Sequence, residues 1–271
     1  MASAPNNLPL FYKDLMPLNM RDHEKWRARR SETAPWMVGQ HAIPLTVDEF
    51  VLAQRDYPIV FSSGDNPVPL ALFGLNEGVN VYVNDDGTVQ GDSTYVPAYA
   101  RRYPFMLARM DANSETMTLC FDPASGLLGE FDDGEVLFEA GGAATEHTQN
   151  VLKFCEDFEH AGQRTQAFMD ELKKHDLLIE GEVGITQEGV EQPFIYRGFQ
   201  LINREKFGEV RGDVLRTWNQ NGFLVLVHAH FFSLDLMRII FARQTQQGKG
   251  PGAEFVANRA AAAEPEKKSK K

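Results

Sequence analysis

Two adjacent arginines stand among three tyrosines in the stretch YVPAYARRYPF, residues 95–105. The planar guanidinium group of arginine matches the two oxygens of a carboxylate or the oxygens of a phosphate, and nearby tyrosines can stack on it or donate hydrogen bonds. If one turn of chain gathers these groups, it can hold an anion. The ligand-binding candidates of the sequence are therefore Tyr95, Tyr99, Arg101, Arg102 and Tyr103.

A structural interpretation of the same stretch is also open. Pro97 is suited to the first position of a short helix, and Pro104 disfavours helical backbone at the residue before it. In that interpretation the tyrosines pack and the arginines pair with acids of the surrounding protein. We expect these side chains to form a rim against the sheet, with at least one arginine held by a carboxylate or facing a pocket.

Two histidines, His228 and His230, give the sequence its candidate metal ligands. The segment FLVLVHAHF is apolar and indicates a buried strand, on which residues two apart share a face. Two imidazoles and a carboxylate form the iron site of non-haem oxygenases. The nearest acid in sequence, Asp235, is placed on a following helix. The alternative is a hydrogen-bonded histidine at the edge of the core.

The charge distribution argues against nucleic-acid binding. The chain carries a formal net charge of −11, and its segment 246–271 carries six cations and three acids. Removing that +3 leaves residues 1–245 at −14, which would repel phosphates over most of the surface. We therefore expect a protein or peptide partner and no nucleic acid.

The cysteine count and the apolar runs bear on the compartment. Cys120 and Cys155 belong to no CxxC pair, which disfavours a structural zinc site and a disulfide framework. The first fifteen residues lack a cationic segment followed by an apolar run, so we expect a cytoplasmic protein. The longest apolar run, GFLVLVHAHFF, is too short as a single run to cross a bilayer, and we expect no transmembrane segment.

Short β-rich segments fill the first half of the chain. YPIVFSS, LALFGL, NVYVN, TMTLCFD and GEVLFE are separated by turn residues, and Asp86-Gly87 is a hairpin signal. Close spacing of this kind favours an antiparallel β meander. HEKWRARRSE (23–32) indicates a short helix with a solvated basic cluster.

Helical periodicity dominates the second half. Apolar residues recur at three and four over residues 146–174, which predicts one long amphipathic helix. PFIYRGFQLI indicates a strand. DVLRTWNQN, FLVLVHAHF and SLDLMRIIFARQ indicate a C-terminal helix-strand-helix. The fold class is α+β, with a single domain over 1–245 and a flexible Lys-rich tail over 246–271.

The chain resembles the SapC family of bacterial proteins in several long stretches, in order, over most of residues 10–245. These stretches are FYKDLMPLN, PLTVDEFVLAQRDYPIVFSS, LALFGLNEGVNVYVNDDG, YVPAYARRYPF, TLCFD, FQLINREKF and NGFLVLVHAHFFSLDLMRIIFARQ. The resemblance implies an association with the paracrystalline bacterial surface layer. The family pattern has a histidine at position 230 and none at 228.

Two classes of function follow. The first is a non-enzymatic accessory or binding protein without a cofactor, which the resemblance links to surface-layer or envelope assembly. The second is a metal-assisted enzyme of the non-haem iron type, with His230 and ligands from elsewhere in the chain. A calcium loop, a phosphate loop and a GxSxG nucleophile motif are each missing a required residue or spacing.

Overall fold

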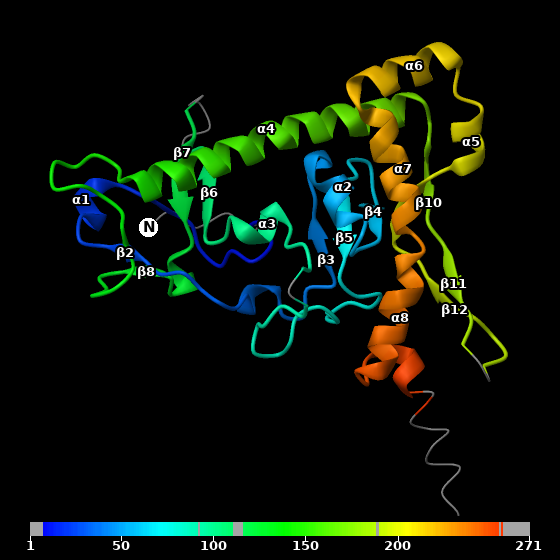
Figure 1. Cartoon of the computed structure of the whole chain (residues 1–271), viewed down its shortest axis with the longest axis horizontal. Coiled ribbons are helices and arrows are strands. Elements are labelled where there is room, and N and C mark those ends of the chain that lie inside the picture. Colours follow the sequence, from blue (N-terminus) through cyan, green and yellow to red (C-terminus); the bar gives the residue numbers. More distant parts are fainter. Residues whose placement is uncertain (1–7, 92, 111–115, 188–189, 255, 257–271) are drawn as a thin grey trace, which may run out of the picture.

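A long helix, α4 (Glu146–Lys174), runs along one edge of the molecule and packs on both of its hydrophobic clusters (Figure 1). The structure is a computed structural model and describes residues 8–91, 93–110, 116–187, 190–254 and 256. Thr145 caps the first turn of α4 by accepting a hydrogen bond from the Thr148 amide, and two lysines lie in the last turn. The helix predicted over residues 146–174 is confirmed at both ends.

The main sheet has five antiparallel strands and carries the larger cluster. Two of its strands, β4 (Ile59–Ser62) and β5 (Pro69–Leu72), form an antiparallel pair, as neighbouring strands of the expected meander would. The order across the sheet is β10 (Leu178–Glu180), β13 (Phe199–Ile202), β4, β5 and β3 (Ala42–Pro44). Strands from both halves of the chain therefore pair, so this sheet is not the sequential meander that was expected.

Three smaller antiparallel sheets complete the β structure of the described ranges, and helices accompany them, so the α+β class is confirmed. The first small sheet is β1 (Met16–Pro17), β7 (Thr118–Phe121) and β6 (Phe105–Ala108); the second is β8 (Leu128–Gly129), β2 (Arg27–Ala28) and β9 (Glu135–Val136); the third is β11 (Val183–Ile185) and β12 (Phe194–Tyr196).

The remaining helices are short in the first half of the chain and longer near its end. They are α1 (Met20–His23), η1 (Pro35–Met37), η2 (Val47–Glu49), α2 (Phe50–Ala53), α3 (Ala98–Arg101), η3 (Pro123–Ser125), α5 (Arg204–Gly208), α6 (Gly212–Asn221), α7 (Phe223–Ser233) and α8 (Leu236–Gln246).

Side-chain hydrogen bonds and glycine account for two strand predictions that were wrong. Asn80 accepts hydrogen bonds from the amides of Tyr82 and Val83, so NVYVN forms a turn with a single β-bridge, Val83 to Val89. The segment 193–202 is two strands rather than one. Gly198, at φ 95°, separates β12 from β13 and lets them join different sheets.

The predicted C-terminal helix-strand-helix is also wrong, because FLVLVHAHF is the helix α7. Gly222, at φ 86°, ends α6 and directly precedes α7. Val225, His228 and Phe232 are exposed, while the residues between them are largely buried, and this spacing of three and four is helical. Two of the exposed residues are apolar, so the sequence shows no amphipathic stripe.

Among the described residues one helical segment, Phe223–Gln246, is long and apolar enough to cross a bilayer by length and composition alone. It lies against the main sheet at one side of the molecule (Figure 1). Buried His230 and Ser233 bond to backbone of the sheet, and 44% of the most apolar window is buried. A core helix of a soluble protein meets the same criteria, so the segment is weak evidence for a membrane span.

The beginning of the expected tail packs on the body. Gln247 Nε2 donates to the carbonyl of Val81 at 3.0 Å, and Lys249 Nζ donates to the carbonyl of Asn80 at 3.0 Å. Residues 250–254 are helical, and Ala253 is buried. A flexible tail starting at residue 246 is therefore wrong for these positions. Residues 257–271, with the lysine cluster, lie outside the described residues.

Truncation should reveal this docking. Removing residues 247–271 should lower the free energy of unfolding by about 1–3 kcal/mol, since two hydrogen bonds and the buried surface of Ala253 are lost. Removing residues 257–271 should leave the melting temperature within about 1–2 °C. Thermal unfolding followed by circular dichroism measures both. Equal melting temperatures for the two truncations would show that segment 247–256 contributes nothing to stability.

Candidate functional site

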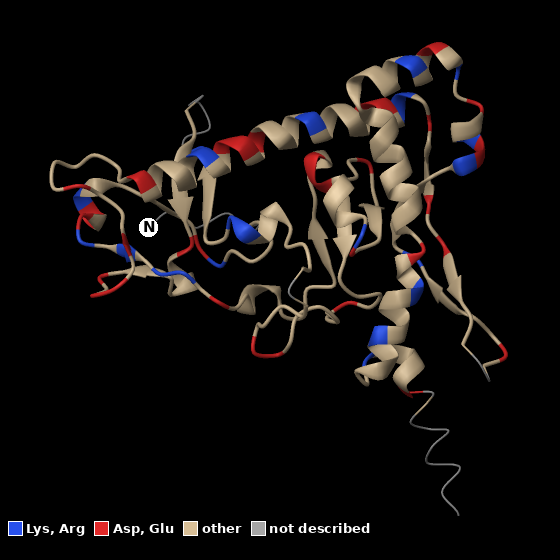
Figure 2. Ribbon diagram, in the orientation of Figure 1, with Lys and Arg blue, Asp and Glu red and all other residues tan. Residues whose placement is uncertain are grey.

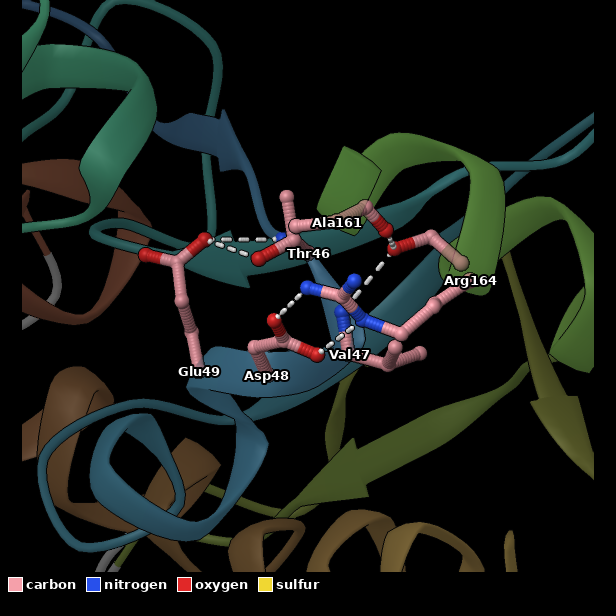
Figure 3. Close-up of polar contacts among 7 residues, drawn as sticks. Thr46, Val47, Asp48, Glu49, Ala161 and Arg164 are labelled. Carbon is pink, nitrogen blue, oxygen red and sulfur yellow. Dashed lines mark hydrogen bonds and ion pairs between the residues drawn. The ribbon is translucent and has the colours of Figure 1, made fainter. Parts of the chain in front are cut away.

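Helix α3, which ends at Arg101 and is directly followed by Arg102, is fixed at its start by the buried carboxylate of Glu49. Glu49 Oε1 accepts hydrogen bonds from the Ala98 amide at 2.6 Å and from Tyr95 Oη at 2.9 Å. Its Oε2 accepts hydrogen bonds from the amide and hydroxyl of Thr46 at 2.8 and 2.9 Å (Figure 3). Four donors on three residues therefore converge on one side chain, which joins α3 to the turn before η2.

The turn around Glu49 is itself joined to α4. The amide of Val47 donates to Thr165 Oγ1, and that hydroxyl donates to the carbonyl of Ala161 (Figure 3). Arg164 and Asp48 form an exposed ion pair beside it. Helices α3 and α4 thus share one anchored framework, which sets the position of the arginine pair relative to α4.

At the edge of the candidate stretch Arg101 is exposed and Tyr95 is half-buried. Arg101 Nε donates to the carbonyl of Val96 at 3.0 Å, and its guanidinium lies 5.3 Å from the ring of Phe154 on α4. Burial and the adjacent Glu49 carboxylate raise the pKa of Tyr95 to about 12, so its hydroxyl keeps its proton and donates. Arg101 remains open to solvent.

Arg102 is buried, with 6% of its surface exposed. Its guanidinium lies 4.6 Å from the ring of Tyr99 and 4.2 Å from that of Phe158 on α4. The nearest carboxylate contact is Glu159 Oε1, 3.6 Å from Nη1. Within the described residues its Nε has no hydrogen-bond partner. A buried guanidinium normally has several acceptors, so Arg102 makes fewer hydrogen bonds than a buried arginine usually does.

The other two tyrosines have structural partners. Tyr99 Oη donates to the carbonyl of Leu10, and Tyr103 Oη donates to the buried carboxylate of Asp122 at 3.1 Å. Burial and that carboxylate raise the pKa of Tyr103 well above its usual range. Its ring packs 4.8 Å from that of Trp36. Both tyrosines are largely buried and belong to the scaffold.

A cavity of about 690 Å³ lies between the arginine pair, the segment after β2 and the first half of α4. Four arginines line it, from segments far apart in the sequence: Arg29, Arg30, Arg101 and Arg102. Among the described residues that line it, Glu32 is the only acid. The basic end of α3 lies below α4 in Figure 2, within a protein whose formal net charge is −11. This arginine cavity is large enough for a drug-sized ligand.

The walls of the arginine cavity are mainly apolar and contain buried polar atoms without partners. Trp36 Nε1 and His147 Nε2 have no hydrogen-bond partner within the described residues. Burial lowers the pKa of His147, which favours the neutral ring. A ligand group that came into contact with these nitrogens would give them the hydrogen-bond partner that they lack. The apolar part of the wall includes Val96, Leu127, Val151 and Phe154.

Cys155 also lines the arginine cavity, but it is not arranged as a nucleophile. Burial raises the pKa of its thiol to about 12, so the thiol is protonated at neutral pH. Cys120 is likewise buried, and both cysteines are free. His160, the histidine nearest to Cys155 in sequence, is exposed on α4 and lines a different hollow with Asp48 and Arg164.

The two candidate metal ligands do not share a face. On α7 the side chains of His228 and His230 diverge, because residues two apart on a helix are about 200° apart. His228 is exposed and stacks on Phe232. His230 is fully buried: its Nδ1 donates to the carbonyl of Ile59 at 2.8 Å, and its Nε2 accepts from the amide of Ile202 at 3.2 Å.

The expectation that His228 and His230 point the same way was therefore wrong, and its cause was the strand assignment. Both nitrogens of His230 are engaged in tying α7 to strands β4 and β13. Within the described residues no group of three or more His, Cys, Asp or Glu side chains is placed to hold a metal ion. In this structure His230 is a buried, hydrogen-bonded residue of the core.

A sequence model of the SapC family matches residues 18–239. This chain belongs to the SapC family. The matched region contains α3, α4, the whole arginine cavity and most of the α7–α8 segment, so these features lie inside the family's defining region. No curated protein and no solved structure matches the chain.

Sequence reasoning missed half of the arginine cavity of this SapC protein. Arg29 and Arg30 were assigned to a solvated helix, but Arg27–Ala28 is strand β2, which is paired on both sides, and the chain after it lines the cavity. Trp36 and His147 carried no local signal. The segments that they meet in the cavity are far away in the sequence, and a single sequence does not reveal such contacts.

Substituting each of the two arginines distinguishes a structural role from a role in ligand binding. Arg102→Ala should lower the free energy of unfolding by about 1–3 kcal/mol, because the rings of Tyr99 and Phe158 lose the packed guanidinium and Glu159 loses its cation. Arg101→Ala, at an exposed position, should change it by less than about 0.5 kcal/mol. Urea unfolding measures both. Unchanged stability in Arg102→Ala would show that this residue has no structural role.

Proposed function

We propose that this SapC-family chain is a non-enzymatic binding protein that acts without a cofactor and holds an anionic group of a protein or peptide partner in the arginine cavity. The observation that carries the proposal is Arg102, a buried cation with an unused Nε donor in the cavity wall. Burying a guanidinium costs free energy unless acceptors surround it. A bound anion supplies the missing acceptors.

The charge of the protein supports selective rather than general anion binding. The acidic body repels anions over most of its surface, while the arginine cavity concentrates positive charge within low-dielectric walls. An anionic group is therefore favoured at this one place. Arg101, exposed at the edge beside Phe154, is positioned to meet the anion first.

Crosslinking in living cells tests this function. A photoreactive phenylalanine analogue at Asn150, an exposed residue of the cavity rim on α4, should give a covalent adduct with the partner. The same analogue at Gln149, exposed one residue away and not lining the cavity, is the matched control. Mass spectrometry reads the adducts. An adduct at 150 that is lost with Arg102→Lys supports the proposal, and equal or absent adducts at both sites contradict it.

We further propose that the protein works from the cytoplasm, in support of surface-layer or envelope assembly. The support for the compartment is chemical, since both cysteines are free and buried as thiols. The support for the assembly role is membership of the SapC family. Fractionation of the producing cells should find most of the protein in the cytosol. Recovery mainly from the medium or the cell surface would contradict this location.

A further inference from the structure

The arginine cavity has room for one negative charge rather than several. Arg29 is paired with Asp133 at 2.5 Å, and Arg30 is 3.3 Å from Glu135. Arg101 bonds through Nε to a backbone carbonyl. Arg102 has an ion-pair contact of 3.6 Å to Glu159, and its buried Nε has no hydrogen-bond partner within the described residues. The charge left over is therefore about one cation, shared between Arg101, whose partner is a neutral carbonyl, and Arg102, whose carboxylate contact is long.

The number of free donors also favours a small anionic head. Three buried nitrogens of residues that line the cavity lack hydrogen-bond partners in the described part of the chain: Arg102 Nε and Trp36 Nε1, which are always donors, and His147 Nε2. Two oxygens of a carboxylate can accept from two such donors. A phosphate monoester carries nearly two charges and three acceptor oxygens, and it would remain undersatisfied among these walls.

The apolar walls point to what is attached to the head. Val151 and Phe154 on α4 and Leu127 beside β8 line the same space as the arginines. Contact with these side chains stabilises an apolar ligand by removing its surface from water, at about 25 cal/mol per Å². A fully hydrated anion such as acetate gains none of this, so the head group alone would bind weakly.

We infer that the arginine cavity takes a monocarboxylate joined directly to an apolar body, with the carboxylate toward Arg102 and Trp36 and the apolar body along Val151 and Phe154. The inference rests on the proposed anion-binding function and names its ligand class. The same chemistry has two sources: a free aliphatic or aromatic acid, or the last residue of a peptide that ends in an apolar side chain with a free carboxyl group.

Calorimetric titration of the full chain tests the ligand class. The probes are decanoate and a pentapeptide ending in leucine with a free carboxyl group. Decanol and the C-terminally amidated peptide lack the charge, acetate lacks the apolar body, and decyl phosphate has a different head. We expect decanoate, the free-acid peptide or both to bind, and the uncharged partner of each to bind at least tenfold more weakly. Binding by decanoate alone identifies a free acid, and binding by the peptide alone identifies a chain terminus.

Three neighbouring positions on α4 localise the binding. Val151→Glu places a carboxylate on the cavity wall and should weaken binding at least tenfold. Asn150→Glu places it on the exposed rim, where folding tolerates it, and should weaken binding severalfold. Gln149→Glu makes the same change of charge outside the cavity lining and should leave binding unchanged. Circular dichroism of each variant shows that it is folded.

The outcomes separate this inference from the proposed function. Tighter binding of decyl phosphate than of decanoate would overturn the ligand class and leave anion recognition standing. Equal affinity for decanol and decanoate would overturn both. Equal weakening by Gln149→Glu and Asn150→Glu would place the ligand outside the arginine cavity and overturn the inference. Failure of every probe would overturn the ligand class, while the crosslinking at Asn150 decides the function independently.

Discussion

Replacing Glu49 with alanine should lower the free energy of unfolding by about 3–5 kcal/mol, because several buried donors lose their acceptor at once. The amides of Thr46 and Ala98 and the hydroxyls of Thr46 and Tyr95 all donate to this carboxylate. Water can reach some of these groups after the substitution, which keeps the loss below the sum of separate penalties. Urea unfolding of wild type and variant measures it.

Asp48→Ala is the matched control for Glu49→Ala. Asp48 is the preceding residue, also an acid, and it pairs with Arg164 at the surface. Exposed ion pairs contribute about 0–1 kcal/mol, so this variant should unfold almost as wild type does. Similar losses in the two variants would show that Glu49 is not the anchor of α3. Loss of anion binding together with stability in Glu49→Ala would be expected, since the arginines lose their position.

Acidification should destabilise the protein through His230. Burial lowers the pKa of His230 to about 4, while an unfolded histidine titrates near 6.5. The unfolded state therefore binds more protons between these values, and the free energy of unfolding falls as pH decreases from about 6.5 to about 4. The contribution of this residue over that window is about 3 kcal/mol.

His230→Gln isolates the contribution of His230 to the pH dependence of stability, because all other titrating groups are common to both proteins. The variant should be less stable than wild type at pH 7.5, and the difference should shrink by about 3 kcal/mol by pH 4. His228→Gln, at an exposed position on the same helix, should change stability at pH 7.5 by less than about 0.5 kcal/mol. A difference between His230→Gln and wild type that stays constant with pH would contradict a buried neutral histidine.

Local patterns in the sequence were sufficient to predict the elements whose apolar residues repeat with a single period. The apolar positions of residues 146–174 repeat at three and four, and α4 has the predicted bounds. Thr46 forms a capping box with Glu49 at the start of η2, and Gly222, at φ 86°, ends α6, so the residue types usual at helix ends occur at both places. The antiparallel pairing of β4 with β5 followed from strands joined by a short turn.

Long-range contacts decided the features that sequence reasoning got wrong. Helix α7 buries polar His230 and exposes apolar Phe232, which is 68% exposed, so its sequence carries neither a helical nor a strand period. The main sheet pairs β4 with β13, some 140 residues away, and no local signal specifies that neighbour. The arginine cavity likewise joins side chains from the segment after β2, from α3 and from α4.

The candidate stretch itself was interpreted in part correctly from its residues. Two forked cations among tyrosines, between two prolines, indicated either a scaffold or an anion site. The structure divides these roles among neighbours: Tyr99 and Tyr103 bond to the scaffold, while Arg102 both packs between rings and faces an arginine-lined cavity. Which role an arginine takes depends on burial and on distant partners, which the stretch alone does not encode.

The most direct test of the recognition site is the nuclear magnetic resonance of the three tryptophan indole N–H groups during titration with decanoate or the free-acid peptide. Trp36 Nε1 has no acceptor within the described residues, whereas Trp218 Nε1 already donates to Glu171 at 3.1 Å. A carboxylate in the arginine cavity should move the Trp36 indole resonance strongly downfield and leave that of Trp218 in place. A ligand that binds without moving the Trp36 resonance, or that moves both equally, would contradict recognition at this cavity.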